Sequence, residues 1–173
     1  MMKKRKIIWG LLLIILIAGI FFCVYIFHEY HEKRIIKVNQ EFRYIDNVGI
    51  KVIKYKSYRD WGTLHIEGEC KIINKLNNEI YFAPSNRVSV KYENGSVEPM
   101  KNKLYQELNR GSSVGYIKRL NKEDICINNF EGSLRPRNKV VAFSVILGVE
   151  ERNKDGKYIK SIIGKSEWIN LED

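Results

Sequence analysis

The sequence predicts an all-β domain, an antiparallel β-sandwich, preceded by one N-terminal transmembrane helix. An uncharged apolar block over residues 7–27 predicts the helix. Some eight short strand-like segments, spaced about 8–12 residues apart with little helical periodicity, predict the sandwich. The length of 173 residues fits one domain with an appendage, and a hydrophobic content of 45% is enough to bury a core.

The apolar block follows a basic cluster over residues 3–6. As a helix it would measure roughly 31 Å, close to the ~30 Å hydrocarbon thickness of a bilayer. Trp9 and Tyr25 stand where an aromatic belt would lie, and the cations favour an N-terminus inside the cell. A cleaved signal peptide is the alternative. We therefore predict a cytoplasmic tail (1–6), a transmembrane helix (7–27), a juxtamembrane stalk that continues the helix (28–41) and an extracytoplasmic β-sandwich (42–173).

Alternating polarity predicts the strands in the first half of the domain. Val48 to Ser57 is rich in β-branched residues, and apolar side chains alternate with polar ones from Thr63 to Asn74. Ile80 to Phe82 follows an Asn-rich turn. Arg87 to Glu93 leads into Asn94-Gly95, a strong hairpin signal because both residues tolerate positive φ.

Shorter apolar segments separated by turns predict the remaining strands. The most apolar of them, Val140 to Val149, is expected to be a central strand. The segment from Leu104 to Asn109 fits either a helical turn or a strand. The other predicted strands are Val114 to Lys118, Ile125 to Ile127, Tyr158 to Ile163 and Ser166 to Leu171, with turns at 134–138 and 155–156.

Two of these regions carry a family resemblance. A strand ending in Asn74, a polar turn and the Asn94-Gly95 hairpin precede a Gly132-Ser133-Leu134-Arg135-Pro136 turn. This arrangement resembles the telokin-like, immunoglobulin-type extracytoplasmic domain found behind an N-terminal anchor on Gram-positive surface proteins. Over roughly residues 45–150 the resemblance implies an immunoglobulin-like sandwich and no catalytic residues. The chain departs from the family at Arg137, where the family has Gly.

Two short motifs could carry chemistry. Gly111 to Gly115 matches the G-x-S-x-G pattern around Ser113, but a hydrolase triad of that order needs a later histidine, and the last one is His65. His28 and His31 are three residues apart, whereas the zinc-protease helix places its histidines four apart. A Gly/Ser loop and a solvated interfacial segment are the simpler interpretations. The sequence predicts no enzyme, no cofactor and no resident metal.

Two cysteines, Cys70 and Cys126, lie outside the apolar block. A pair in an extracytoplasmic sandwich could bridge the two sheets, as in immunoglobulin domains. Alternation points Cys70 inward, whereas Cys126 lies between Ile125 and Ile127 in the opposite phase to both. A disulfide and two buried or half-buried free thiols both remain open.

Cations alternate with aromatic residues just before the strand from Thr63, and a second basic loop lies downstream. Such surfaces bind phosphates, sugars or anionic headgroups, or are merely a solvated strand end. The net charge of +10 owes much to residues 3–6, so the rest is only mildly basic and does not predict a nucleic-acid binder. The candidate patch residues are Lys54, Tyr55, Lys56, Tyr58, Arg59 and Trp61, with Arg135, Arg137 and Lys139 in the second loop.

Together these features predict a membrane-anchored, non-enzymatic binding or assembly module outside the cytoplasm. We expect its sandwich edges and loops to contact an envelope protein, an anionic wall polymer or lipid. Two alternatives stay open. One is a structural subunit of an envelope secretion or conjugation complex. The other is a small envelope hydrolase or metal-dependent enzyme.

Overall fold

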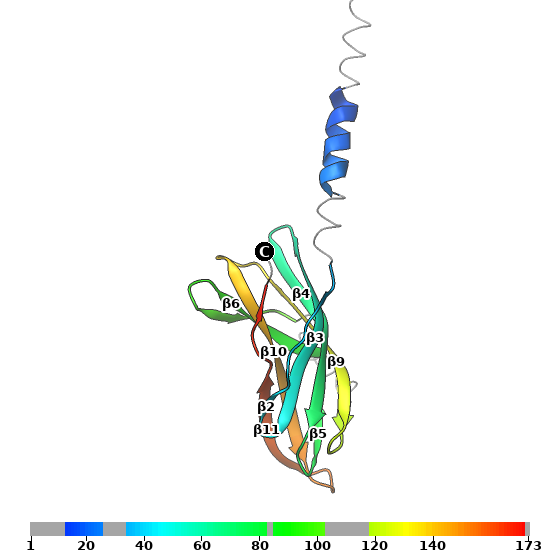
Figure 1. The fold of residues 1–173 in the computed structure, drawn as a ribbon, viewed down its shortest axis with the longest axis vertical. Helices are drawn as coiled ribbons and strands as arrows, with labels where there is room; N and C mark the ends of the chain where they lie inside the picture. The colour runs from blue at the N-terminus through cyan, green and yellow to red at the C-terminus, as the bar shows by residue number, and fades with distance from the viewer. Residues whose placement is uncertain (1–12, 26–33, 83–84, 103–117, 172–173) are drawn as a thin grey trace, which may run out of the picture. The chain divides into compact units, whose positions relative to one another are not determined.

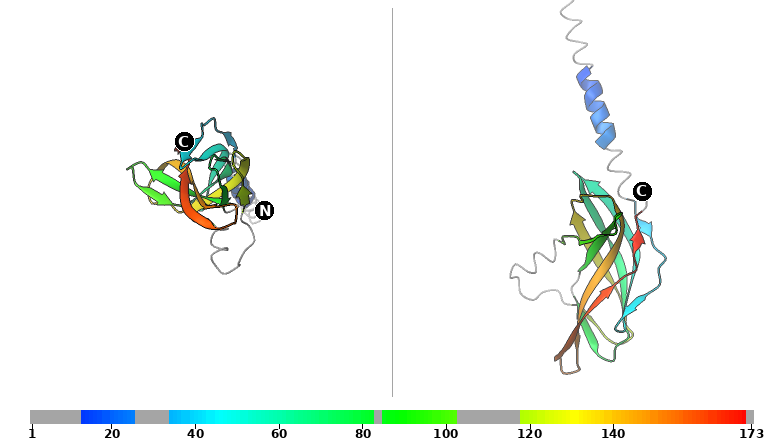
Figure 2. Two further views of the ribbon diagram at one scale, coloured as in Figure 1. Left: turned by 90° about the horizontal axis from the view of Figure 1, so that it is seen from below. Right: turned by 90° about the vertical axis from the view of Figure 1, so that its left-hand side faces the viewer.

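The computed structural model describes residues 13–25, 34–82, 85–102 and 118–171. The chain divides into two compact units, Met1–Arg34 and Ile35–Asp173, and each is described by itself. We call the second one the β unit. Its strands are drawn in Figures 1 and 2.

The first unit contains a helix over residues 13–25, which corrects the predicted transmembrane helix over 7–27. A helix of that length rises about 20 Å, short of the ~30 Å that a bilayer requires. Within the described ranges, no helix is both long and apolar enough to cross a membrane. The other residues of the predicted span lie outside the described ones. The large apolar side chains of the helix, such as Phe21 and Phe22, are exposed.

The β unit consists of two sheets that share strand β6, which confirms the predicted β-rich fold and is consistent with a β-sandwich. β6 begins beside β9 in a short parallel pair and then runs antiparallel to β10. The first sheet contains β1 (Ile36–Lys37), β2 (Arg43–Ile45), β3 (Val48–Asp60), β4 (Thr63–Asn74) and β9 (Ile125–Leu134). The second contains β5 (Glu79–Phe82), β6 (Ser85–Tyr92), β7 (Val97–Pro99), β8 (Lys118–Leu120), β10 (Val140–Arg152), β11 (Tyr158–Lys165) and β12 (Ile169–Asn170).

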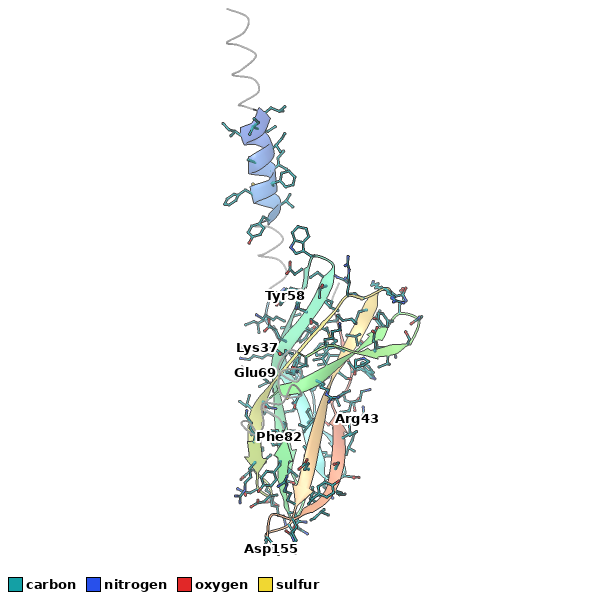
Figure 3. All side chains as sticks on the ribbon, turned by 180° about the vertical axis from the view of Figure 1, so that it is seen from behind. Lys37, Arg43, Tyr58, Glu69, Phe82 and Asp155 are labelled. Carbon is teal, nitrogen blue, oxygen red and sulfur yellow. The ribbon has the colours of Figure 1, made fainter. Side chains whose placement is uncertain are left out.

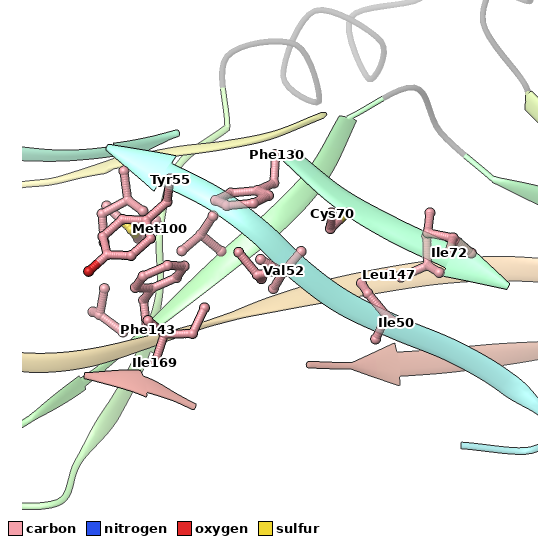
Figure 4. Close-up of a cluster of buried hydrophobic side chains, with 14 of the residues drawn as sticks. Ile50, Val52, Tyr55, Cys70, Ile72, Met100, Phe130, Phe143, Leu147 and Ile169 are labelled. Carbon is pink, nitrogen blue, oxygen red and sulfur yellow. The ribbon is translucent and has the colours of Figure 1, made fainter. Parts of the chain in front are cut away.

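The core lies between the inner faces of the two sheets (Figure 4). Phe143 of β10 is fully buried, and its ring centroid lies 4.8 Å from that of Tyr55 and 6.0 Å from that of Phe130. Tyr55 and Phe130 belong to the first sheet, so this aromatic cluster joins the two layers. Contacts of this kind, together with the area that they bury, hold a sandwich together.

Several predicted strands are confirmed, and β4 has the predicted bounds, Thr63–Asn74. The segment after residue 34 is an exception, because Ile36–Lys37 forms β1 against β3 instead of continuing a helical stalk. Residues 104–109 and 114–117 lie outside the described part of the chain.

A β-bulge in β3 decides which of its side chains face the core. The register between β3 and β4 shifts between Val52 and Lys54, so one residue of β3 has no partner. Val48, Ile50 and Val52 point inward before the bulge, and Tyr55 is the next buried residue after it. The bulge therefore reverses the phase of the strand.

Candidate functional site

The hairpin between β3 and β4 ends in a two-residue turn, Trp61-Gly62. Asp60 pairs with Thr63, and the φ angles of Trp61 and Gly62 are +46° and +77°. Two successive left-handed residues are the mark of the type I′ turn that suits the twist of a hairpin. The side chain of Trp61 is 93% exposed.

Tryptophan is a poor residue for this position. Type I′ turns favour Asn, Asp and Gly, and the turn between β2 and β3 follows that rule with Asp46 and Asn47 at φ values of +48° and +62°. A bulky side chain in the left-handed region costs roughly 1–2 kcal/mol. Trp61 thus has a strained backbone and an exposed side chain that does not stabilise the core. This combination indicates that the residue serves a function other than folding.

Two arginines flank the turn. Arg59 is exposed at the end of β3, and Nε of Arg135 lies 3.8 Å from where a Cβ on Gly62 would stand. Arg135 reaches this place because β9 pairs with β4 as far as Leu134 opposite Leu64. The structure thereby joins the two basic segments that the sequence left apart. We call Arg59, Trp61 and Arg135 the tip surface, and the end of the β unit that carries it the tip end.

Arg137 and Lys139 are exposed farther along the same loop. The carbonyl of Lys139 accepts a 3.0 Å hydrogen bond from the N–H of Glu93, which begins the turn between β6 and β7. The charge of Arg137 acts on the neighbouring Tyr92. Both cations therefore sit beside a second hairpin, next to the tip surface along the chain but outside it.

Tyr55 and Tyr58 of the predicted patch do not belong to the tip surface. Tyr55 is 2% exposed and belongs to the core, which corrects its assignment to a surface patch. The ring of Tyr58 stacks on His65, its cross-strand partner, with centroids 4.8 Å apart and planes 7° from parallel. Figure 3 shows Tyr58 towards one end of the β unit and Asp155 at the other.

Lys54 and Lys56 lie on the outer face of the first sheet and are ion-paired. Nζ of Lys54 is 2.8 Å from Glu69 and Nζ of Lys56 is 2.9 Å from Glu67, each carboxylate belonging to the residue directly opposite on β4. These four side chains line a groove of about 500 Å³ together with Ile35, Asn129 and Glu131. Sequence reasoning missed the glutamates, although their alternation in β4 already placed them on the same face.

Cys70 and Cys126 are free thiols and do not form the disulfide that the sequence left open. The two cysteines lie on neighbouring strands of the first sheet, β4 and β9, where Cys70 is opposite Asn128 and Cys126 is opposite Ile72. Because both belong to one sheet, a disulfide between them would not join the two sheets. The buried Cys70 Sγ accepts a hydrogen bond from Asn86 Nδ2 (3.0 Å) and donates one to the carbonyl of Asn128 (3.4 Å). Cys70 therefore has a structural role.

The burial of Cys70 makes stability sensitive to alkali. Burial raises the pKa of its thiol from 9.0 to about 12, so the folded state keeps the proton that the unfolded state releases above pH 9. The free energy of unfolding should fall as the pH rises from 9 towards 12, by up to about 1.4 kcal/mol per pH unit from this group. Urea unfolding at pH 8, 10 and 11 under reducing conditions measures the slope.

Cys70→Ala is the matched variant for this measurement, since it removes the titrating group. We expect it to be less stable at pH 8 but to lose less stability between pH 8 and 11 than the wild type does. Tyr92 adds to the slope in both proteins above pH 10, because burial and the hydrogen bond that its hydroxyl donates to Glu98 (2.6 Å) raise its pKa to about 12. Equal slopes would contradict the assignment to Cys70.

Two predicted motifs cannot be placed, because Gly111 to Gly115 with Ser113, and His28 with His31, lie outside the described residues. Within the described ranges, no group of three or more His, Cys, Asp or Glu side chains could hold a metal ion.

No protein-family model matches the chain, and no curated protein matches it significantly. Similar solved structures include a Northeast Structural Genomics Consortium target, with a TM-score of 0.46 and 10% identity over 75% of this chain and 88% of that one. A conserved hypothetical protein from Bacillus anthracis has a TM-score of 0.44 and 12% identity over 67% of this chain and 92% of that one. Likenesses this weak carry no argument about family or function.

Proposed function

We propose that the protein is a non-enzymatic binding module of the cell envelope, placed outside the cytoplasm, which holds an anionic partner at the tip surface. The supporting observation is Trp61, an almost fully exposed tryptophan in a strained turn. Tryptophan and arginine are enriched among the residues that carry most of the free energy of binding.

The distribution of charge favours the tip surface over the groove. Glu69 and Glu67 already neutralise Lys54 and Lys56, so the groove offers an anion little net attraction. At the tip, two arginines, Arg59 and Arg135, lie at the turn that carries Trp61. A guanidinium group presents a fork of donors that suits carboxylates and phosphates.

Binding of the full-length protein to purified cell envelopes tests this proposal. The protein is kept in mild detergent and the bound fraction is measured by co-sedimentation at about 0.1 M salt. We expect the double variant Arg59→Gln and Arg135→Gln to bind about 10- to 30-fold more weakly, since each cation near an anionic surface contributes about 1 kcal/mol. Higher salt should reduce the difference by screening.

The matched control is the double variant Lys154→Gln and Lys157→Gln. It removes the same charge from exposed residues of the turn between β10 and β11, at the end of the β unit opposite the tip surface. All three proteins share the same N-terminal segment, so any binding through that segment is common to them. Equal loss in the two double variants would show a non-specific effect of net charge and contradict the proposal.

A further inference from the structure

We infer that the anionic partner of the tip surface is a lipid surface, and that the indole of Trp61 enters its headgroup region. This inference rests on the proposed function and narrows its partner from anions in general to anionic lipid. Three features of the β unit support it: the shape of the tip, the chemistry of its side chains and the place where the chain enters.

The shape of the tip favours a deformable partner. Trp61 stands at the apex of a hairpin and is 93% exposed. It belongs neither to the groove over β3, β4 and β9 nor to the smaller pocket beside His65, Lys101 and Ser133. A protein or polymer hot spot is surrounded by contacts that exclude water, whereas a lipid headgroup layer can close around a protruding side chain.

The side chains of the tip fit the membrane interface. Indole has an apolar body and one N–H donor, and tryptophan is enriched at the level of lipid headgroups for that reason. Arg59 and Arg135 lie at the same turn, and the stem of an arginine can lie along apolar surface while its guanidinium group stays in water. One aromatic wedge and two cations form a small amphipathic contact.

The chain enters the β unit from the tip end. β1 runs antiparallel to β3 with Ile36 opposite Tyr55, so residues 34 and 35 lie on the side of Tyr55 towards which β3 runs to its turn. The uncharged apolar block over residues 7–27 comes just before this entry point in the sequence. The most apolar part of the sequence is therefore joined to the β unit through residues that enter at the end that carries Trp61.

Fluorescence quenching by brominated lipids tests the inference on the full-length protein. Replacing Trp9 and Trp168 by Phe leaves Trp61 as the single tryptophan. The control reporter lacks all three tryptophans and carries Tyr158→Trp, an exposed position at the end opposite the tip surface. Both proteins are added to vesicles of phosphatidylcholine with or without about 30% phosphatidylglycerol, whose anionic headgroup attracts cationic side chains.

We expect Trp61 fluorescence to shift to shorter wavelength and to be quenched at least two-fold by brominated lipid in the anionic vesicles. The Tyr158→Trp reporter should be quenched far less. Adding Arg59→Gln to the single-Trp61 protein should lower its vesicle affinity about five-fold, the factor equivalent to one interfacial cation.

Three results would overturn the inference: no quenching of Trp61, equal quenching of both reporters, or equal quenching of Trp61 in neutral vesicles. If envelope binding still depended on Arg59 and Arg135 in that case, the proposed function would stand with a wall polymer or an acidic protein as its partner. If Trp61 were not quenched selectively and envelope binding did not depend on Arg59 and Arg135 either, the proposed function itself would be contradicted.

Discussion

Replacing Gly68 by alanine should destabilise the β unit by about 3 kcal/mol or more, a large share of the 5–15 kcal/mol that holds a typical domain together. A Cβ on Gly68 would lie 2.2 Å from the carbonyl oxygen of Lys54, 2.8 Å from Cα of Tyr55 and 2.7 Å from Cζ of Phe130. The first two are backbone atoms of the neighbouring strand, so no change of side-chain rotamer relieves the clash. The strands would have to separate.

The reason for this glycine lies in the aromatic cluster of the core. Tyr55, Gly68 and Phe130 form one row across β3, β4 and β9, with Gly68 in the middle. Both rings also pack on Phe143 of the opposite sheet. A row of three side chains would not fit beneath Phe143, and the missing Cβ lets Phe130 close over the backbone of β4.

Urea unfolding of the full-length protein measures the effect. Gly148→Ala is the matched control, because Gly148 lies in β10 and no heavy atom outside residues 147–149 stands within 4 Å of its would-be Cβ. We expect that control to be neutral or slightly more stable, since glycine in a strand has excess conformational freedom when unfolded. A Gly68→Ala protein as stable as Gly148→Ala would contradict the packing described here.

The sequence predicted best where local periodicity alone decides the structure. The bounds of β4 are those predicted, because apolar residues alternate regularly from Leu64 to Ile72. β3 shows the limit of this reasoning. If the alternation of β3 continued unbroken after Val52, the side chains of Lys54 and Lys56 would point into the core. Two lysines at core positions indicate a break in the alternation, and the bulge is that break: it buries Tyr55 instead.

Features that depend on pairing between distant segments could not be predicted. Ile36–Lys37 forms a strand because it pairs with the edge of β3, and the residues next to it in the sequence do not indicate this pairing. Arg135 meets Gly62 only through the register of β4 with β9, two strands about 60 residues apart in the chain. The apolar block over 7–27 was likewise interpreted by its length, whereas the described helix covers only residues 13–25.

Trp61 was named as a candidate, but the strain that makes it informative is visible only in the structure. Its φ of +46° costs stability that Asn would largely recover, because Asn-Gly is the preferred type I′ pair. We therefore expect Trp61→Asn to raise the free energy of unfolding by about 1 kcal/mol. The melting temperature of a domain of this size should rise by about 3–4 °C, measured by circular dichroism.

The same substitution should weaken envelope binding by about 30-fold, equivalent to some 2 kcal/mol, because it removes the one large aromatic group of the tip surface. Opposite signs for stability and binding separate a functional residue from a structural one, since a loss of fold would lower both. Trp61→Tyr is the control: it keeps an aromatic ring and the backbone strain, so it should retain part of the binding at unchanged stability. If Trp61→Asn bound envelopes as tightly as the wild type, Trp61 would have no role in binding, and its strained turn would need another explanation.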